Sequence, residues 1–150
     1  MRTKIVPYDS DFLDLSYHWF KDASLRRLTR TQSITRTEQL KWYNSLVYRD
    51  DYKIWGVEHN GEKVGVCGLK HITTEDAEYF GFIGQQHNRG KGIGTDIMDL
   101  MILVSREMKL SSIWLSVLSD NTSALYLYQK KGFVLESQKD CLVIMRKVLA

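Results

Sequence analysis

The sequence contains little proline, little cysteine and no long apolar run. Among its 150 residues there are one proline and two cysteines, and the longest apolar run lies around residues 101–104. Such a run is far too short to cross a bilayer. Because Cys67 and Cys141 have no CxxC partner and no nearby histidine pair, neither a zinc site nor a disulfide framework is indicated. We expect no metal ion, and two buried, reduced thiols.

The chain also lacks a strong charge of one sign. Its formal net charge is +3, which is too small to indicate a nucleic-acid partner. The first seven residues lack the apolar stretch of a signal peptide, so we expect a cytoplasmic location and no membrane partner. Hydrophobic residues make up 43% and charged residues 26% of the chain, as in soluble globular proteins, and 150 residues suit one domain.

The apolar pattern predicts a mixed α/β fold. An Asn60-Gly61 turn between two alternating segments predicts a hairpin. Thr35 and Glu38 have the spacing of a capping box that opens a helix. Strands are expected near residues 5–6, 54–57, 64–66, 77–84, 113–118, 133–135 and 142–145, and helices near 12–19, 38–46, 93–109 and 121–131. The order is therefore β-α-α-β-β-β-α-β-α-β-β.

A glycine-rich segment, Arg89-Gly90-Lys91-Gly92-Ile93-Gly94, lies between a predicted strand and a predicted helix. Backbone N–H groups converge there at the positive end of the helix dipole, which suits a pyrophosphate. A dinucleotide loop of the form GxGxxG fits less well, because Thr95 stands where its last glycine is needed. The alternative is a helix start whose glycines serve only the turn.

Two blocks of residues resemble one family. Arg89-x-x-Gly92-x-Gly94 matches the Gln/Arg-x-x-Gly-x-Gly/Ala signature of the GNAT N-acetyltransferases. The segment from Asn121 to Phe133 is similar to the Asn-x-x-Ala helix of that family, which ends in Tyr-x-Lys-x-Gly-Phe. The resemblance implies the GNAT fold, a mixed, mostly antiparallel sheet of about seven strands with about four helices. It also implies acetyl-CoA as cofactor and direct transfer of the acetyl group to a primary amine in a ternary complex.

The resemblance implies a role for individual residues. The pyrophosphate of coenzyme A would be held by the backbone amides of Arg89, Gly90, Lys91, Gly92, Ile93, Gly94 and Thr95. The strand Phe82-Ile83-Gly84 would pair with the pantetheine arm, and Asn121 would bond the same arm. Tyr128 would meet the thiol, where a phenol can donate a proton to sulfur. The alternative for Tyr128 is a tyrosine of the core.

The general base has several candidates. Glu78 lies on the strand that leads to the glycine-rich segment, and it matches an acid of related family members. The alternatives for Glu78 are a solvated strand carboxylate or a charge that binds the substrate. His71 and His87 are also able to move protons near neutral pH, but each is a lone histidine beside a loop, and we favour Glu78.

The acceptor amine is predicted from the N-terminal half. Segments 42–46, 60–65 and 78–84 resemble the branch that acetylates the 4-amino group of a nucleotide-linked sugar in pseudaminic acid biosynthesis, and also the branch that acetylates ribosomal-protein N-termini. The guanidinium groups of Arg26, Arg27 and Arg30 match phosphate oxygens and would repel a polyamine, which favours the amino sugar.

Other interpretations of these residues stay open. The three arginines can also form a solvated basic surface. The chain can also be an acyl-CoA sensor without catalysis, which would bind the cofactor without turnover. The exposed edge of the last hairpin can pair between chains, so a homodimer is possible.

Overall fold

The computed structural model describes residues 2–149, which form five α-helices packed on one seven-stranded sheet. The helices are α1 (Ser10–Trp19), α2 (Ala23–Thr29), α3 (Arg36–Ser45), α4 (Ile93–Glu107) and α5 (Thr122–Lys130). The strands are β1 (Thr3–Pro7), β2 (Lys53–His59), β3 (Glu62–Lys70), β4 (Asp76–Ile83), β5 (Ser112–Leu118), β6 (Val134–Lys139) and β7 (Leu142–Val148). Two short 3-10 turns cover Leu46–Tyr48 and Gln86–Asn88. The spatial order of the strands is β1-β2-β3-β4-β5-β7-β6.

Local sequence signals explain most of these elements. Thr35 and Glu38 form the reciprocal capping box that opens α3, as predicted. Asn60 and Gly61 both adopt positive φ, +53° and +83°, in the tight turn between β2 and β3. The mixed sheet is confirmed, and the predicted elements follow one another in the predicted order, but a fifth helix lies between the first two that were predicted. The missed helix, α2, has only seven residues, too few for a helical period to stand out.

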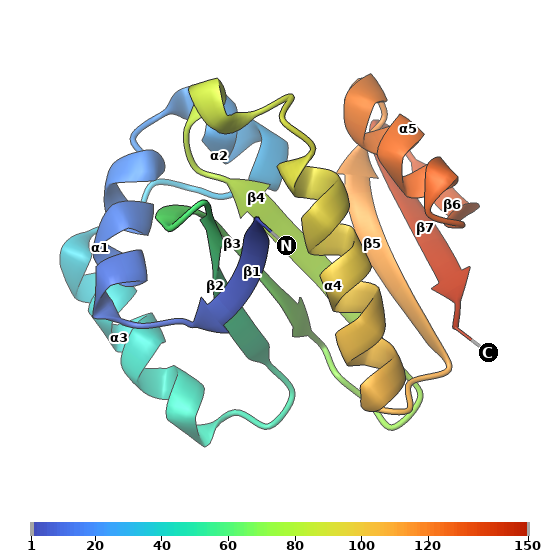
Figure 1. Cartoon of the computed structure of the whole chain (residues 1–150), viewed down its shortest axis with the longest axis horizontal. Coiled ribbons are helices and arrows are strands. Elements are labelled where there is room, and N and C mark those ends of the chain that lie inside the picture. Colours follow the sequence, from blue (N-terminus) through green and yellow to red (C-terminus); the bar gives the residue numbers. More distant parts are fainter. Residues whose placement is uncertain (1, 150) are drawn as a thin grey trace.

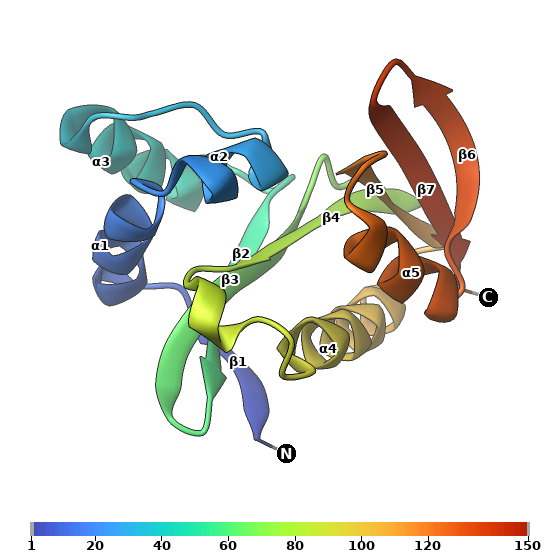
Figure 2. The same cartoon turned by 90° about the horizontal axis from the view of Figure 1, so that it is seen from above.

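The helices form a layer on each face of the sheet (Figures 1 and 2). On one face, α4 and α5 cover a core that includes Ile97, Met101 and Leu115. On the other face, α1 and α2 cover a smaller core around Phe12 and Trp19. Because helices cover both faces, much of the middle of the sheet is buried, and a separation between two strands would give a ligand access to it.

The strands β4 and β5 provide such a separation. They are parallel neighbours, whereas every other pair in the described sheet is antiparallel. Their pairing covers only Asp76–Glu78 against Ser112–Trp114. Both strands then continue for several residues without pairing with each other, and Figure 1 shows them diverging towards the top of the molecule. The sheet is therefore closed at one end of this pair and open at the other.

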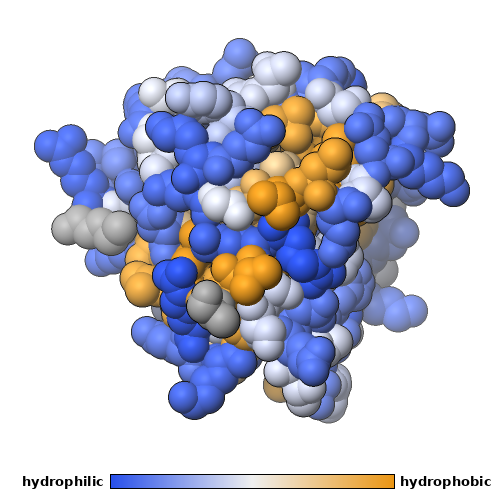
Figure 3. Space-filling view, turned by 90° about the vertical axis from the view of Figure 1, so that its right-hand side faces the viewer, coloured by the Kyte–Doolittle hydropathy of each residue, from blue (hydrophilic) through white to orange (hydrophobic). Residues whose placement is uncertain are grey.

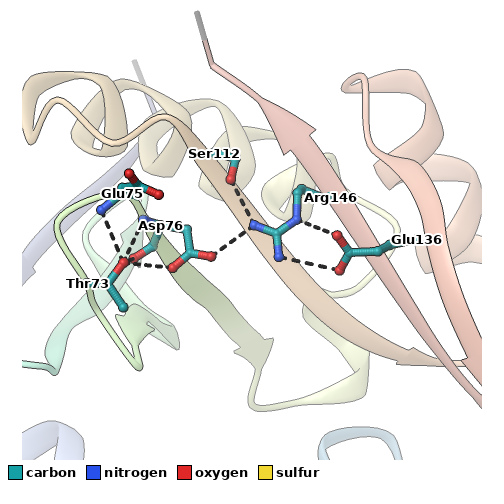
Figure 4. A network of polar contacts seen from close by, with 6 residues as sticks. All are labelled: Thr73, Glu75, Asp76, Ser112, Glu136 and Arg146. Carbon is teal, nitrogen blue, oxygen red and sulfur yellow. Dashed lines mark hydrogen bonds and ion pairs between the residues drawn. The ribbon is translucent and has the colours of Figure 1, made fainter.

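An arginine ties the closed end together (Figure 4). Arg146 of β7 donates from Nη1 to Asp76 Oδ2 at 3.0 Å and to Ser112 Oγ at 2.8 Å. Its Nε donates to Glu136 Oε1 of β6 at 2.7 Å. Asp76 and Ser112 are also the first residues of β4 and β5 that pair with each other. One guanidinium thus connects β4, β5, β6 and β7 at the closed end.

The edge of the sheet formed by β6 is exposed. All six residues of β6 are exposed, and its outer side has no strand neighbour within residues 2–149. Figure 3 shows apolar patches among hydrophilic residues on this side of the molecule. The homodimer expected through this edge remains a prediction.

The two cysteines lie in different environments. Cys67 is buried in β3, as predicted, whereas Cys141 is exposed in the turn between β6 and β7, so the prediction of a second buried thiol is wrong. The polar turn carries Cys141 beyond the reach of either core. No helix formed by residues 2–149 is long and apolar enough to span a membrane.

Candidate active site

The opening between β4 and β5 leads into a cavity of about 770 Å³. This volume is typical of sites for cofactors and small molecules. One wall consists of β4, β5, α5 and the start of α4, and the other of α1–α3, β2 and β3. The sequence-predicted residues that line this cavity are Arg30, Glu78, Phe82, Ile83, Arg89, Gly90, Gly92, Gly94, Thr95, Asn121 and Tyr128. Residues from four distant parts of the chain are therefore brought to one site.

The start of α4 forms one end of the cavity. Gly92 is the N-cap residue with φ +82°, and no side chain caps the helix. Gly90 also has positive φ, +76°, and no heavy atom lies within 4 Å of the position where a Cβ would stand on either glycine. Since the first N–H groups of a helix have no partner within it, this end offers free donors beside open space.

Three other residues predicted to bind the cofactor are placed differently. Ile93 is buried in the core, so only its backbone is available to a ligand. Lys91 lines a separate polar cavity of about 560 Å³, together with Asn88 and Asp96. The N–H of Gly84 already donates to the carbonyl of Val64 at 2.8 Å. The glycine at position 84 is required because the indole of Trp19 occupies the place of a Cβ.

Helix α5 places a polar side chain at each of its ends. Asn121 caps the helix, and its Oδ1 accepts the N–H of Ala124 at 3.4 Å. Tyr128 lies near the other end, half-buried against Tyr79 and Phe133, with ring centroids 6.5 and 5.8 Å away. Burial raises the pKa of Tyr128 to about 12. The phenol therefore keeps its proton at neutral pH, and its hydroxyl can act there as a hydrogen-bond donor.

Glu78 lies in the wall of the cavity and is only 6% exposed. Its Oε1 lies 2.8 Å from Nδ1 of His71, which follows β3. A solvated strand carboxylate, one of the alternatives for Glu78, is therefore wrong. A buried carboxylate with one hydrogen-bond partner suits either proton transfer or recognition of a cationic group.

The three arginines of the N-terminal half do not meet at one point. Arg30 lines the cavity, and its Nη1 donates to the carbonyl of Ser116 at 3.4 Å. Arg26 instead donates to the carbonyl of Phe20 at 2.6 Å, and Arg27 pairs with Asp120 at 2.6 Å. Neither Arg26 nor Arg27 lines the cavity.

Sequence reasoning missed a group of aromatic side chains in the half of the cavity next to α1 and α3. The rings of Tyr8, Trp42, Tyr52 and Phe80 follow one another with centroids 5.4 to 6.2 Å apart. Burial raises the pKa of Tyr8 to about 12 and also raises that of Tyr52. These rings come from four separate parts of the chain, so no spacing in the sequence marks them as a group.

The charges that line the cavity are mostly positive. Arg30, Lys70, Arg89 and Lys130 line it, against Glu78 as the one acid among the lining residues that the structure describes. An anionic group is therefore favoured at its polar parts. In the described residues, no group of three or more His, Cys, Asp or Glu side chains is arranged to hold a metal ion.

The family profile for the acetyltransferase (GNAT) family matches residues 13–133, which span both the glycine-rich segment and α5. The chain belongs to this family. It is an N-acetyltransferase, and its acyl donor is acetyl-CoA. The site fits this donor in three ways: an uncapped helix start beside open space, an unpaired strand edge, and a cavity of cofactor size.

Curated relatives within the GNAT family are distant. The alpha/beta-tubulin-N-acetyltransferase 9 of Drosophila melanogaster is 26% identical over an alignment 155 positions long, which covers 89% of this chain and 76% of that protein. An N-acetyltransferase 9-like protein of Caenorhabditis briggsae is 26% identical over 144 residues, which cover 86% of this chain and 73% of that protein.

Solved GNAT structures share the whole fold. Campylobacter jejuni N-acetyltransferase PseH in complex with acetyl coenzyme A has a TM-score of 0.78 and 20% identity, with 99% of each chain covered. Vibrio cholerae spermidine N-acetyltransferase in complex with CoA and spermine has a TM-score of 0.85 and 18% identity, with 97% of this chain and 93% of that chain covered. At these identities the likeness shows the fold alone.

Proposed function

We propose that this N-acetyltransferase acetylates the primary amine of an amino sugar carried on a nucleotide. The observation that carries the proposal is the composition of the cavity lining, which combines aromatic rings with cations. Tyr8, Trp42 and Tyr52 offer flat apolar surfaces for a sugar or a base. Arg30 and Lys70 supply positive charge for phosphate oxygens.

A polyamine fits this composition less well. An acceptor with several ammonium groups needs several carboxylates, and Glu78 is the one acid that lines the cavity in the described part of the chain. The cations Arg30 and Lys70 would repel such a substrate. The proposal therefore differs from the substrate named for the Vibrio cholerae relative, despite the shared fold.

For the donor, we propose that the backbone amides of residues 89–95 hold the pyrophosphate of acetyl-CoA. The free edge of β4 near Phe82 and Ile83 pairs with the pantetheine arm, and Asn121 bonds the same arm from α5. Gly90 and Gly92 leave room for the phosphates because they carry no Cβ. Bound in this way, acetyl-CoA supplies the thioester whose acetyl group is transferred.

Three groups of the chain then serve the transfer. Glu78 takes the proton that the amine loses as its nitrogen bonds to the acetyl carbon. A backbone N–H at the free edge of β4, near Ile83, polarises the carbonyl oxygen of the acetyl group. Tyr128 donates a proton to the sulfur as the carbon–sulfur bond breaks. After the transfer Glu78 is protonated and Tyr128 is a phenolate, so the cycle closes when Glu78 releases one proton to solvent and Tyr128 takes one proton up from solvent.

A second candidate acceptor is the N-terminal amine of a protein. It is favoured by the match to the alpha/beta-tubulin-N-acetyltransferase of Drosophila melanogaster, which covers most of this chain. A peptide would place its α-amine beside Glu78 and its first side chain among the aromatic rings. The basic residues of the cavity would then favour an acidic second or third residue.

An amine panel tests these acceptors. The protein is incubated with acetyl-CoA and with aminosugar nucleotides, peptides or polyamines, and acetylated product is measured by mass spectrometry. We expect turnover with an aminosugar nucleotide at least about tenfold above that with the same sugar lacking the nucleotide, because phosphate contacts are lost. Faster turnover with peptides would favour the second candidate, and tight acetyl-CoA binding without any turnover would favour a sensor.

The arginines provide a matched pair for the same assay. Arg30→Gln removes a charge that lines the cavity, whereas Arg27→Gln removes one that is paired with Asp120 outside its lining. We expect Arg30→Gln to raise KM for the nucleotide-linked acceptor and Arg27→Gln to leave it unchanged. Equal effects of both variants would count against direct phosphate recognition by Arg30.

A further inference from the structure

His71 connects the buried carboxylate of Glu78 to water. Its Nδ1 lies 2.8 Å from Glu78 Oε1, while its side chain is 59% exposed and that of Glu78 only 8%. One nitrogen of the ring therefore contacts the cavity wall, and more than half of the side chain is accessible to solvent. A bound acceptor would cover the face of Glu78 that lines the cavity, and His71 would then be its remaining route to water.

The backbone and a neighbouring ring hold His71 in this position. Its φ is +53°, in the left-handed region that a non-glycine residue adopts at a cost. The imidazole stacks on Trp114 of β5, with ring centroids 6.2 Å apart and planes at 12°. The next residue, Ile72, donates its N–H to the carbonyl of Asp51 at 3.1 Å. Two contacts therefore orient the ring, the stacking on Trp114 and the hydrogen bond with Glu78, while the bond of Ile72 holds the backbone beside it.

The charged groups around the pair are few. Lys70 precedes His71 and lies opposite Glu78 in the register of β3 and β4. Asp51 lies within electrostatic reach of His71 and is itself hydrogen-bonded to Arg49, which is the main reason why the pKa of Asp51 is lowered. An imidazolium at His71 would thus face two carboxylates, Glu78 and Asp51, each with a cation nearby.

We propose that His71 is the outlet of a proton relay, which receives from Glu78 the proton lost by the acceptor amine and passes it to water. This inference rests on the proposed role of Glu78 as general base. The carboxyl proton crosses the 2.8 Å contact to Nδ1, and the imidazolium then releases its Nε2 proton to solvent. One proton enters and one leaves, and only O–H and N–H bonds change. His71 starts as the Nε2–H tautomer and ends as the Nδ1–H tautomer, and proton exchange with solvent restores the first before the next turnover.

The relay makes the exposed histidine a positioning and proton-transfer residue rather than a binding residue. Its loss should slow turnover without weakening the binding of either substrate. The variant His71→Gln keeps a hydrogen-bond donor near Glu78 but cannot carry a proton. The control is His18→Gln, which removes an exposed histidine on α1 that lies outside the cavity lining.

The test uses the full chain, acetyl-CoA and an amine that the wild type acetylates. We expect His71→Gln to lower kcat by about 10- to 100-fold, with KM for both substrates within about twofold of wild type. The acidic limb of the pH–rate profile should change, and added imidazole should restore part of kcat. His18→Gln should match the wild type. Unchanged kcat and pH profile in His71→Gln would overturn the relay.

A second variant separates the relay from the base itself. Glu78→Gln should lower kcat at least as much as His71→Gln, and the double variant should be no slower than Glu78→Gln alone, because both act on one proton path. If Glu78→Gln is slow and His71→Gln is not, only the relay fails. If Glu78→Gln retains full kcat, the proposed base fails and the relay with it. Thermal unfolding of each variant shows whether folding is affected.

Discussion

Glu78 of β4 lies opposite Trp114 of β5 in the last cross-strand pair before the two strands separate. The buried carboxylate therefore stands where the sheet begins to open, and the same Trp114 stacks on the imidazole that contacts it. The carboxylate of Glu78 and the opening between the two strands thus lie at the same place in the sheet. The closed end of the strand pair must remain intact for Glu78 to keep this position.

The clamp at that closed end yields a prediction on stability. Arg146→Met removes the bonds to Asp76, Ser112 and Glu136 and leaves Asp76 with a partly buried, unpaired charge. We expect the free energy of unfolding to fall by about 1–3 kcal/mol, measured by urea denaturation. The control, Lys4→Met, removes an ion pair with Glu58 in which Nζ and Oε1 are 3.8 Å apart. It should lower the free energy of unfolding by less than about 1 kcal/mol. Equal losses in both variants would contradict the clamp.

If Tyr128 is the acid, its hydroxyl should be needed for turnover but not for binding acetyl-CoA. Tyr128→Phe removes the phenol hydroxyl, and we expect kcat to fall by about 100-fold or more while the Kd for acetyl-CoA changes little. The control is Tyr126→Phe, since Tyr126 is 65% exposed on the same helix. Stopped-flow turnover and calorimetric titration measure the two quantities. An unchanged kcat in Tyr128→Phe would remove Tyr128 as the acid.

The glycine at the start of α4 has a matched control in the β2–β3 turn. Gly92 and Gly61 have φ of +82° and +83°, and neither has a heavy atom within 4 Å of the place that a Cβ would occupy. Alanine should therefore strain both sites similarly, by about 1–2 kcal/mol. Only Gly92→Ala should weaken coenzyme A binding, by about tenfold or more, because its methyl group enters the space proposed for the pyrophosphate. Calorimetry of both variants checks this, and equal Kd values would contradict the proposed phosphate site.

The two thiols should react very differently. Burial raises the pKa of Cys67 to about 12 from its ordinary value of 9.0, so its thiolate is scarce at pH 8. We expect an aromatic disulfide reagent to label one thiol of the folded protein, and none in Cys141→Ser, since Cys141 is the exposed one. Both thiols should react in urea. Fast labelling of folded Cys141→Ser would contradict the buried position of Cys67.

The raised pKa of Cys67 also has a consequence for stability at high pH. The folded chain holds this proton more tightly than the unfolded chain, so the thiol's contribution to stability is complete below pH 9. The unfolded chain releases the proton first as the pH rises, and the contribution is lost between about pH 9 and pH 12. Cys67→Ala should flatten this part of the stability curve.

Local signals in the sequence were enough for most of the fold. The capping box at Thr35, the Asn60-Gly61 turn and the glycine-rich segment each act through neighbouring residues, and each predicted its element correctly. Helix α2 was missed because its seven residues bury only Leu25, which gives no period. The exposed position of Cys141 was missed because burial of a turn residue depends on the whole fold.

The site depends more on tertiary contacts, so less of it could be predicted. No sequence signal marks where the pairing of β4 with β5 stops, because this depends on how two whole strands twist apart. The burial of Glu78 and its contact with His71 follow from that geometry, and the two residues lie seven positions apart in the chain. The aromatic rings at positions 8, 42, 52 and 80 come together only after folding.

The most direct test of the proposed mechanism is a crystal structure with acetyl-CoA and an unreactive acceptor analogue bound. We expect the pantetheine arm between β4 and β5, the pyrophosphate at residues 89–95, and the sulfur beside the hydroxyl of Tyr128. The acceptor nitrogen should lie on the Glu78 side of the thioester. Coenzyme A bound outside this opening, or a sulfur remote from both Tyr128 and Glu78, would contradict the mechanism.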